Sequence, residues 1–200
     1  GTPPLCEDPH AALLCAEFLD PALAEAFANS PLLQAGIEIL AVRTRCLDDW
    51  IERPSWPPVH TTKRQIVLLG AGMDTRAYRL GLSMHTTTIF EVDSDVAVLE
   101  AKHAALAADG RRARVPVVRC EADISDAVAC GAALTAAGLD PTVPTRWVAE
   151  GLLEYLPSES HPCLFQMATE LGGAPGSGFA AQARCRWPCC SSEPFDTRHC

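Results

Sequence analysis

One stretch of the chain, residues 65–93, limits the possible folds more than any other. It reads QIVLLGAGMDTRAYRLGLSMHTTTIFEVD. A short aliphatic run, Gln65–Leu69, stops at a Gly-Ala-Gly turn, and after a polar connection a second apolar run, Thr88–Val92, ends on Asp93. This order is typical of the first strand–turn–helix–strand unit of a nucleotide-binding sheet. The glycines let the backbone turn tightly and approach a ligand, and Asp93 is placed to accept hydrogen bonds from ribose hydroxyls.

The glycine turn by itself leaves the ligand open. Thr75 stands where a dinucleotide-binding fingerprint has its third glycine, the one that allows close packing of helix on strand. This favours an adenosine ligand without a pyrophosphate over NAD or FAD, and S-adenosylmethionine (SAM) is the commonest such ligand. An ordinary turn between strand and helix in a doubly wound sheet, with nothing bound, also fits the pattern.

Longer motifs resemble those of a known family. The segments LLGAGMDTRAYRL, FEVD and, much later, WVAEGLLEYLP are similar to those of SAM-dependent methyltransferases of the leucine carboxyl methyltransferase type. That family includes many bacterial O-methyltransferases of unknown substrate. The similarity runs in order from about Gln34 to Ser177 and is loose over residues 1–33. It implies an α/β fold with a doubly wound, mostly parallel Rossmann-like sheet of about five strands and an N-terminal helical cover.

The same resemblance divides the chain into three parts. We expect a helical cover over residues 1–53, a SAM-binding α/β domain over residues 54–184 and an irregular tail over residues 185–200. Beyond about Gly178 the similarity fades, whereas family members continue and supply the closing strands and much of the acceptor site. We therefore interpret the chain as C-terminally truncated, with a disordered tail and an unpaired sheet edge.

Arginines and an aspartate near the glycine turn are candidates for the amino-acid end of SAM. By the resemblance, Arg43 falls where the family places an arginine that pairs with the SAM carboxylate, and a guanidinium suits this because it forms two parallel hydrogen bonds. Arg45 competes for this role, and either residue also fits a solvated helix charge. Asp74 fits a contact with the methionine end of SAM and, equally, a cap on the following helix. Arg76 and Arg79 are interpreted as surface or structural charges.

Acidic residues lie at the ends of the expected second, third and fourth strands. Glu91 and Asp93 lie two residues apart, so their side chains share one face of the strand; Asp93 is the stronger ribose ligand, and Glu91 supports it or the loop. By the resemblance, Asp123 takes the adenine amino group with Ile124 beside the ring, although Asp123 also fits a helix N-cap. By the resemblance, Glu150 lies beneath the sulfonium; it also fits a strand-end carboxylate that binds neighbouring amides. The expected cofactor-binding residues are therefore Arg43, Gly70, Ala71, Gly72, Asp74, Glu91, Asp93, Asp123, Ile124 and Glu150, with no metal ligand and no catalytic residue nominated.

Hydrophobic periodicity predicts helices around the sheet. Residues 1–29 carry helical patterns broken by prolines. Ser30 and Pro31 open a helix that ends before Pro54, with Ser30 as N-cap and one apolar face packed inward, and residues 55–64 form a linker. Further helices are expected over Asp95–Asp109, with His103 packed, and over Ser125–Ala137 and Ser158–Leu171; strands are expected over Gln65–Leu69, Thr88–Val92, Val115–Cys120, Thr145–Ala149 and Phe179–Ala183.

Composition limits which classes of partner the protein is expected to bind and in which cellular compartment it is expected to lie. The net charge of −9 argues against nucleic acid, and the absence of a long apolar run or a secretory leader argues against a membrane and for the cytoplasm. Six of the ten cysteines are scattered singly and are interpreted as small buried apolar residues. The other four, crowded beside His199, offer only a loose version of a zinc site.

These features predict a SAM-dependent O-methyltransferase that acts on a carboxylate or hydroxyl of a small molecule or protein. A carboxylate acceptor needs no general base, because positioning and desolvation supply most of the rate. A truncated, inactive SAM-binding or interaction protein is the alternative. Thr75 and the absence of a YxxxK-type pair disfavour a nicotinamide-dependent reductase.

Overall fold

The computed structural model describes residues 5–16, 29–53 and 63–182, together with residues 20, 22 and 25. Most of the expected linker, the tail over residues 185–200 with its loose set of zinc ligands, and most of residues 17–28 lie outside this part of the chain. Within it, no group of three or more His, Cys, Asp or Glu side chains is arranged to hold a metal ion. No helix of the described part is long and apolar enough to cross a bilayer.

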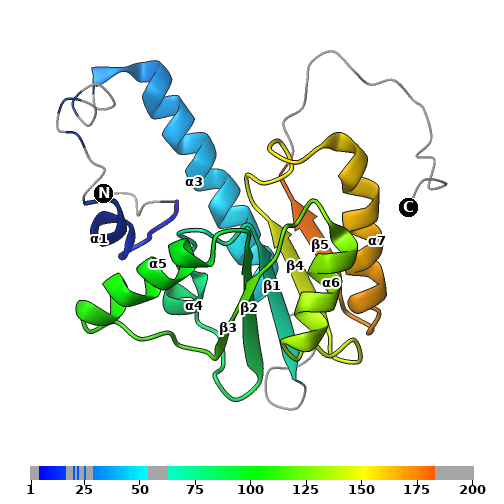
Figure 1. The fold of residues 1–200 in the computed structure, drawn as a ribbon. Helices are drawn as coiled ribbons and strands as arrows, with labels where there is room; N and C mark the ends of the chain where they lie inside the picture. The colour runs from blue at the N-terminus through cyan, green and yellow to red at the C-terminus, as the bar shows by residue number, and fades with distance from the viewer. Residues whose placement is uncertain are drawn as a thin grey trace.

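Five parallel strands form the centre of the molecule (Figure 1). Their spatial order is β3-β2-β1-β4-β5, so the chain winds outward from β1 in one direction and then in the other. Strand β1 is buried at all six positions, as expected for a central strand covered on both faces. This confirms the doubly wound Rossmann-like α/β fold. The strands are β1 Arg64–Leu69, β2 Thr87–Asp93, β3 Val117–Glu121, β4 Thr145–Ala149 and β5 Gly178–Ala181.

The strand register brings several expected site residues to one edge of the sheet. Leu69 at the end of β1 pairs with Val92 of β2 and with Ala149 of β4. The residues that follow these three positions therefore lie at the carboxyl edge. In open α/β sheets, ligands bind outside this edge where the strand order reverses, which here is the junction of β1 and β4.

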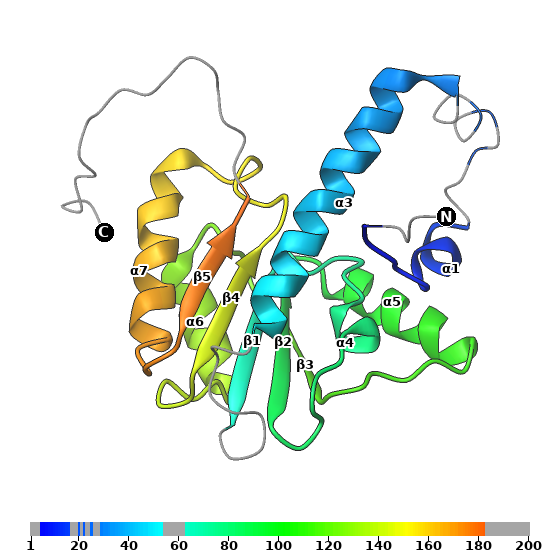
Figure 2. The same cartoon turned by 180° about the vertical axis from the view of Figure 1, so that it is seen from behind.

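Helices cover both faces of the sheet (Figure 2). On one face, α6 (Ala127–Ala136) and α7 (His161–Leu171, after a 3₁₀ turn over Ser158–Ser160) pack on a core that includes Val67 and Trp147. On the other face, α5 (Val96–Ala108) and the end of α3 (Pro31–Glu52) pack on a core that includes Ile66 and Leu68. Alternate residues of β1 thus enter opposite cores, because successive side chains of a strand point to opposite faces.

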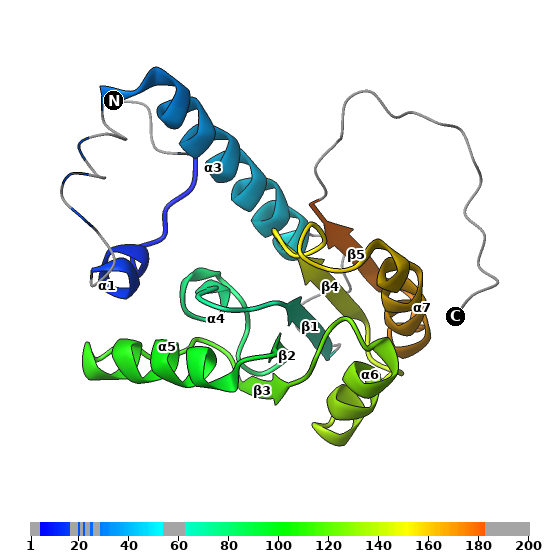
Figure 3. The same cartoon turned by 45° about the horizontal axis from the view of Figure 1, so that its top comes forward.

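Helix α3 begins as expected but packs less than expected. Ser30 is its N-cap, since the Ser30 hydroxyl accepts from Leu33 N–H, and Pro31 is its first residue. The prediction that one whole face packs inward is wrong. The side chains of Leu33, Ile37 and Leu40 are 36%, 49% and 49% exposed, and burial is confined to the last turns of the helix. A 22-residue helix is about 33 Å long and a six-residue strand about 20 Å, so the first half of α3 extends past the sheet (Figure 3).

The helix expected between β1 and β2 is a single turn, α4 (Arg76–Arg79). Leu80 is extended, and Gly81 follows it, a residue that disfavours helix. The Gly81 N–H donates to Glu52 Oε1 at 2.9 Å, which fixes the chain in a loop toward β2. The short crossover keeps the residues after the glycine turn close to the sheet.

The described N-terminal segment contacts the region after the glycine turn. The Thr75 hydroxyl donates to Asp8 Oδ2 at 2.7 Å, and the His10 ring packs edge-on against Tyr78. Leu14 of α1 (Ala11–Cys15) enters the same core as α5. Residues 5–16 therefore pack against α5 and the segment that follows the glycine turn.

The six scattered cysteines do not all behave as buried apolar residues. Cys120 and Cys130 are buried, and burial raises the pKa of both thiols, that of Cys130 to about 12. Cys15 and Cys46 are exposed, so the prediction is wrong for these two. Each follows or precedes a buried leucine, Leu14 or Leu47, on a helix that packs with one face, so the cysteine side chain lies on another face.

Candidate functional site

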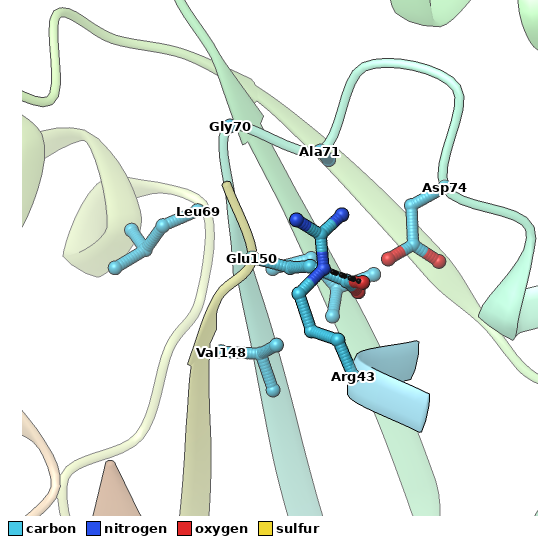
Figure 4. Close-up of a pocket in the computed structure, with 8 residues that line it drawn as sticks. Arg43, Leu69, Gly70, Ala71, Asp74, Val148 and Glu150 are labelled. Atoms are coloured by element: carbon cyan, nitrogen blue, oxygen red, sulfur yellow. Dashed lines mark hydrogen bonds and ion pairs between the residues drawn. The ribbon is translucent and has the colours of Figure 1, made fainter. Parts of the chain in front are cut away.

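A cavity of about 190 Å³ opens at the carboxyl edge between the ends of β1 and β4 (Figure 4). Its walls come from the glycine turn, from both strands and from one residue of α3. The location is the reversal point of the strand order, where the fold places ligands. The residues that line it are Arg43, Leu68, Leu69, Gly70, Ala71, Asp74, Val148 and Glu150.

The glycine turn is held against the end of β2 by backbone and side-chain bonds. Gly70 and Gly72 have φ angles of 65° and 38°, which favour glycine. The Ala71 N–H donates to Val92 O at 3.0 Å, and the Gly72 N–H donates to Asp93 Oδ2 at 2.9 Å. The other oxygen of Asp93 accepts from Asp95 N–H at 3.1 Å. Asp93 therefore fixes the turn and stands beside it, although it is not among the residues that line the cavity.

Arg43 and Glu150 meet across the cavity. Arg43 Nε donates to Glu150 Oε1 at 2.8 Å, and Arg43 Nη1 donates to Gln182 Oε1 at 2.9 Å. The two terminal nitrogens of Arg43 point toward Gly70 in Figure 4. Thr44, the next residue of α3, donates its hydroxyl to the same Glu150 oxygen at 2.8 Å. Helix α3 thus brings a guanidinium to the glycine turn and ties it to the end of β4.

Arg45, the competitor of Arg43, points elsewhere. Its side chain is 57% exposed and pairs with Asp49 one turn further along α3, at 2.7 Å. It does not line the cavity. The structure therefore brings Arg43, and not Arg45, to the glycine turn.

Glu150 is held as a carboxylate by cations. Burial by itself raises the pKa of Glu150. The charge of Arg76 and the hydrogen bonds that Glu150 accepts from Arg76, Thr44 and Arg43 outweigh burial, so the pKa lies below the usual value for glutamate. Glu150 is therefore ionised at neutral pH.

Because the folded state lowers the pKa of Glu150, this carboxylate stabilises the fold at neutral pH and loses that effect in acid. The contribution is full above the unfolded-state pKa of about 4.5 and is lost as pH falls through the lower folded-state pKa. We expect Glu150→Gln to be less stable than the unchanged chain by about 1–3 kcal/mol at pH 7. Urea unfolding between pH 7 and pH 3 checks this: the difference should shrink below about pH 4.5, and a difference constant with pH would contradict it.

Asp74 lies on the far side of the cavity, just before the single turn of α4. Its Oδ1 accepts from Arg76 N–H at 2.7 Å, and its other oxygen binds the Arg76 side chain. Asp74 therefore satisfies an amide at the start of α4, as one of its two readings expected, although the N-cap residue is Thr75. The carboxylate also lines the cavity, so the structure leaves room for the second role.

Arg76 joins three carboxylates from separate elements. Its Nε donates to Asp48 Oδ1 of α3 at 2.7 Å, its Nη1 binds Asp74, and its Nη2 donates to Glu150 Oε2 at 2.6 Å. The side chain is 2% exposed. The prediction that Arg76 is a surface charge is wrong, and the alternative prediction, that it is a structural charge, is confirmed. Arg79 also binds Asp48 and has no cavity carboxylate among its described partners.

Glu91 lies away from the cavity in a buried cluster. It is 0% exposed, and its oxygens lie 2.9 Å from Lys102 Nζ and 2.8 Å from His103 Nε2. Lys102, also 0% exposed, donates to the backbone oxygen of Asp74 at 2.8 Å. His103 Nδ1 binds the Tyr78 hydroxyl. Glu91 thus supports the loop through Lys102, which is the second of the two roles that the sequence left open for it.

Asp123 and Ile124 follow β3 at the same carboxyl edge. Asp123 is exposed and accepts from Ser125 N–H and from the Ser125 hydroxyl, both at Oδ1, which lowers its pKa. The N-cap of α6 is Asp126, which accepts from Ala129 N–H at 2.9 Å, so the N-cap reading of Asp123 is wrong. Ile124 is buried in the core under α6.

The profile of a known family matches this chain. Residues 2–169, most of the chain, match the family described as leucine carboxyl methyltransferase. The chain belongs to the leucine carboxyl methyltransferase family. The glycine turn and the segment after β4 both lie within the matched residues.

Relatives in this family carry names that assign them, provisionally, as S-adenosyl-L-methionine-dependent methyltransferases. One from Mycolicibacterium smegmatis is 43% identical over 143 residues, which cover 72% of this chain and 42% of the relative. One from Mycobacteroides abscessus is 38% identical over 183 residues, which cover 90% of this chain and 58% of the relative. One from Mycolicibacterium vanbaalenii is 38% identical over 192 residues, which cover 91% and 60%. The chain spans about half the length of these curated relatives.

In this leucine carboxyl methyltransferase family member, the expected cofactor residues fall into three groups. Some line the cavity, some stand at neighbouring strand ends, and one is buried behind the loop. The lining residues are Arg43, Gly70, Ala71, Asp74 and Glu150; the strand-end residues with the second glycine of the turn are Gly72, Asp93, Asp123 and Ile124; the buried one is Glu91.

Three residues of the site were missed or misread from sequence. Gln182 follows β5 at the same edge and binds Arg43, whereas the strand expected over Phe179–Ala183 ran through it, so the sequence did not mark it as a residue of the edge. No site role was expected for Thr44, yet its hydroxyl binds Glu150. Arg76 was read as a surface or structural charge, and no local pattern distinguishes it from Arg79.

Proposed function

We propose that the chain binds SAM at the carboxyl edge of the sheet and transfers its methyl group to a carboxylate or hydroxyl oxygen of an acceptor. The observation that carries the proposal is the cavity beside the glycine turn, which has a guanidinium, Arg43, on one side and two carboxylates, Asp74 and Glu150, around it. The methionine end of SAM carries a carboxylate, an ammonium and a sulfonium. Opposite charges in one small cavity therefore match it better than they match a uniformly anionic pyrophosphate.

In this proposal the adenosine end lies along the neighbouring strand ends. Asp93 uses one lone pair of each oxygen for Gly72 and Asp95, and each carboxylate oxygen has a second one for a ribose hydroxyl. Both bonds from Ser125 reach Oδ1 of Asp123, so an adenine amino group would bind Oδ2. Ile124 would lie beside the ring, and Glu91 would act only through the loop.

The reaction needs positioning more than proton transfer. The acceptor oxygen attacks the methyl carbon in line with the sulfonium, the carbon–sulfur bond breaks, and its electron pair returns to sulfur to give S-adenosylhomocysteine. A carboxylate acceptor brings its own nucleophilic electron pair, so no general base is assigned. A hydroxyl acceptor must lose a proton to solvent or to a nearby base.

Isothermal titration with SAM, S-adenosylhomocysteine and NAD tests the cofactor. We expect binding of the first two and not of NAD. A folded sample that ignores SAM and S-adenosylhomocysteine at millimolar concentration would overturn the proposal.

Transfer of labelled methyl from SAM to a panel of carboxylate and hydroxyl acceptors tests the reaction. Incorporation that is base-labile, as esters are, identifies a carboxylate acceptor, and base-stable incorporation identifies a hydroxyl. SAM binding with no transfer to any acceptor would favour the inactive SAM-binding alternative. A cytoplasmic location and the absence of nucleic-acid and membrane partners stay predictions of the sequence.

A further inference from the structure

Arg76 is a buried cation that lies behind the cavity and does not line it. Its three guanidinium nitrogens reach three carboxylates, of which Asp74 and Glu150 line the cavity and Asp48 does not. A planar guanidinium holds its partners in a fixed fork, unlike the flexible ammonium of lysine. One side chain therefore joins the two cavity carboxylates to each other, while Arg43 and Thr44 hold Glu150 at its other oxygen.

A second buried cation holds Asp74 from its backbone. Lys102 Nζ donates to the carbonyl oxygen of Asp74 at 2.8 Å and pairs with Glu91. Arg76 binds the side chain of the same residue. Asp74 thus stands between two buried cations from α4 and α5, and it is Arg76 that fixes where its carboxylate points.

We propose that Arg76 is a positioning residue for the amino-acid end of SAM: it orients the Asp74 and Glu150 carboxylates toward the ligand's ammonium and sulfonium and does not itself touch the ligand. The inference rests on the proposed function. It gives Arg76, a residue of the segment that follows the glycine turn, a specific role in ligand binding in addition to its role in stability. An ammonium is recognised by fixed carboxylates, and a carboxylate that turns freely must be ordered when the ligand binds, which weakens binding.

Arg79 supplies a matched comparison. It comes from the same helical turn, is mostly buried and also binds Asp48. Among the described residues its carboxylate partner is Asp48 alone, and Asp48 does not line the cavity. A change at Arg79 therefore perturbs the same packing without releasing a cavity carboxylate.

The test compares Arg76→Lys and Arg79→Lys by isothermal titration with three ligands. SAM and S-adenosylhomocysteine carry the amino-acid end, and 5′-methylthioadenosine has the same adenosine without it. For Arg76→Lys we expect SAM and S-adenosylhomocysteine to bind roughly tenfold more weakly, the loss of about one charge-assisted hydrogen bond, with methylthioadenosine changed by less than about twofold. For Arg79→Lys we expect all three affinities to stay within about twofold of the unchanged chain.

A merely structural role gives a different pattern, because a damaged sheet edge weakens all three ligands together. Equal losses for the three ligands in Arg76→Lys, or unchanged SAM binding, would overturn the inference. Should Arg76→Lys fail to fold by circular dichroism, Asp74→Asn takes its place and must show the same selective loss. Failure of the unchanged chain to bind SAM would overturn the proposed function itself, so the two failures are distinguishable.

Discussion

Replacement of Arg43 by alanine is expected to weaken SAM binding by about 10- to 150-fold. Arg43 is the cation whose terminal nitrogens point toward the glycine turn. A hydrogen bond to a charged group contributes about 1.5–3 kcal/mol, and each 1.4 kcal/mol of binding free energy changes the affinity about tenfold. The fold should survive, because Glu150 keeps Arg76 and Thr44 as partners. Isothermal titration with SAM measures the loss.

Arg45→Ala is the control for this experiment. Arg45 lies two residues from Arg43 on the same helix and is exposed. It forms a surface salt bridge with Asp49, an interaction that contributes little to stability. We expect its SAM affinity to match that of the unchanged chain. If Arg45→Ala loses as much affinity as Arg43→Ala, the assignment of Arg43 to the SAM carboxylate is wrong.

Replacement of Lys102 by methionine is expected to lower the free energy of unfolding by about 3–5 kcal/mol. Lys102 and Glu91 are both 0% exposed, and removal of the ammonium leaves the buried Glu91 carboxylate with the His103 ring but without its lysine partner. The Asp74 carbonyl also loses its donor. Urea unfolding followed by circular dichroism measures the effect.

Two further variants distinguish the loss of the buried Lys102–Glu91 pair from a general effect of removing a lysine. Lys63→Met removes an exposed lysine just before β1 and should change stability by less than about 0.5 kcal/mol. The double variant Glu91→Leu with Lys102→Met removes both charges and should recover part of the loss, because the unpaired buried charge is gone. A double variant less stable than Lys102→Met would contradict this explanation.

Much of the fold could be predicted from interactions between residues close together in the sequence. The aliphatic run of β1 is set by side-chain chemistry over a few residues, and the structure places the buried strand β4 at the expected bounds. Caps are equally local: Ser30 and Asp95 each accept a bond from an amide two or three residues ahead. The cavity residues that a motif carries, such as Asp74, were also identified from sequence.

What was misread depends on partners far along the chain. Arg76 binds Asp48 and Glu150, which lie 28 and 74 positions away, and Gln182 lies 139 positions from Arg43. No spacing rule links such positions. The exposed first half of α3 was also not predictable. The apolar period of the helix predicts that one face packs, but it does not say where the sheet beneath that face ends.

The sequence alone determined that a glycine turn joins two buried strands, that acidic residues follow the strand ends, and that the chain resembles the family to which it belongs. These features follow from backbone freedom, side-chain apolarity and short-range order. Only the tertiary structure decided that Arg43 and not Arg45 faces the turn, that Glu91 is buried behind it, and that Arg76 joins the two cavity carboxylates. Burial and the choice of ionic partner are set by the packing of separate elements, which no single segment specifies.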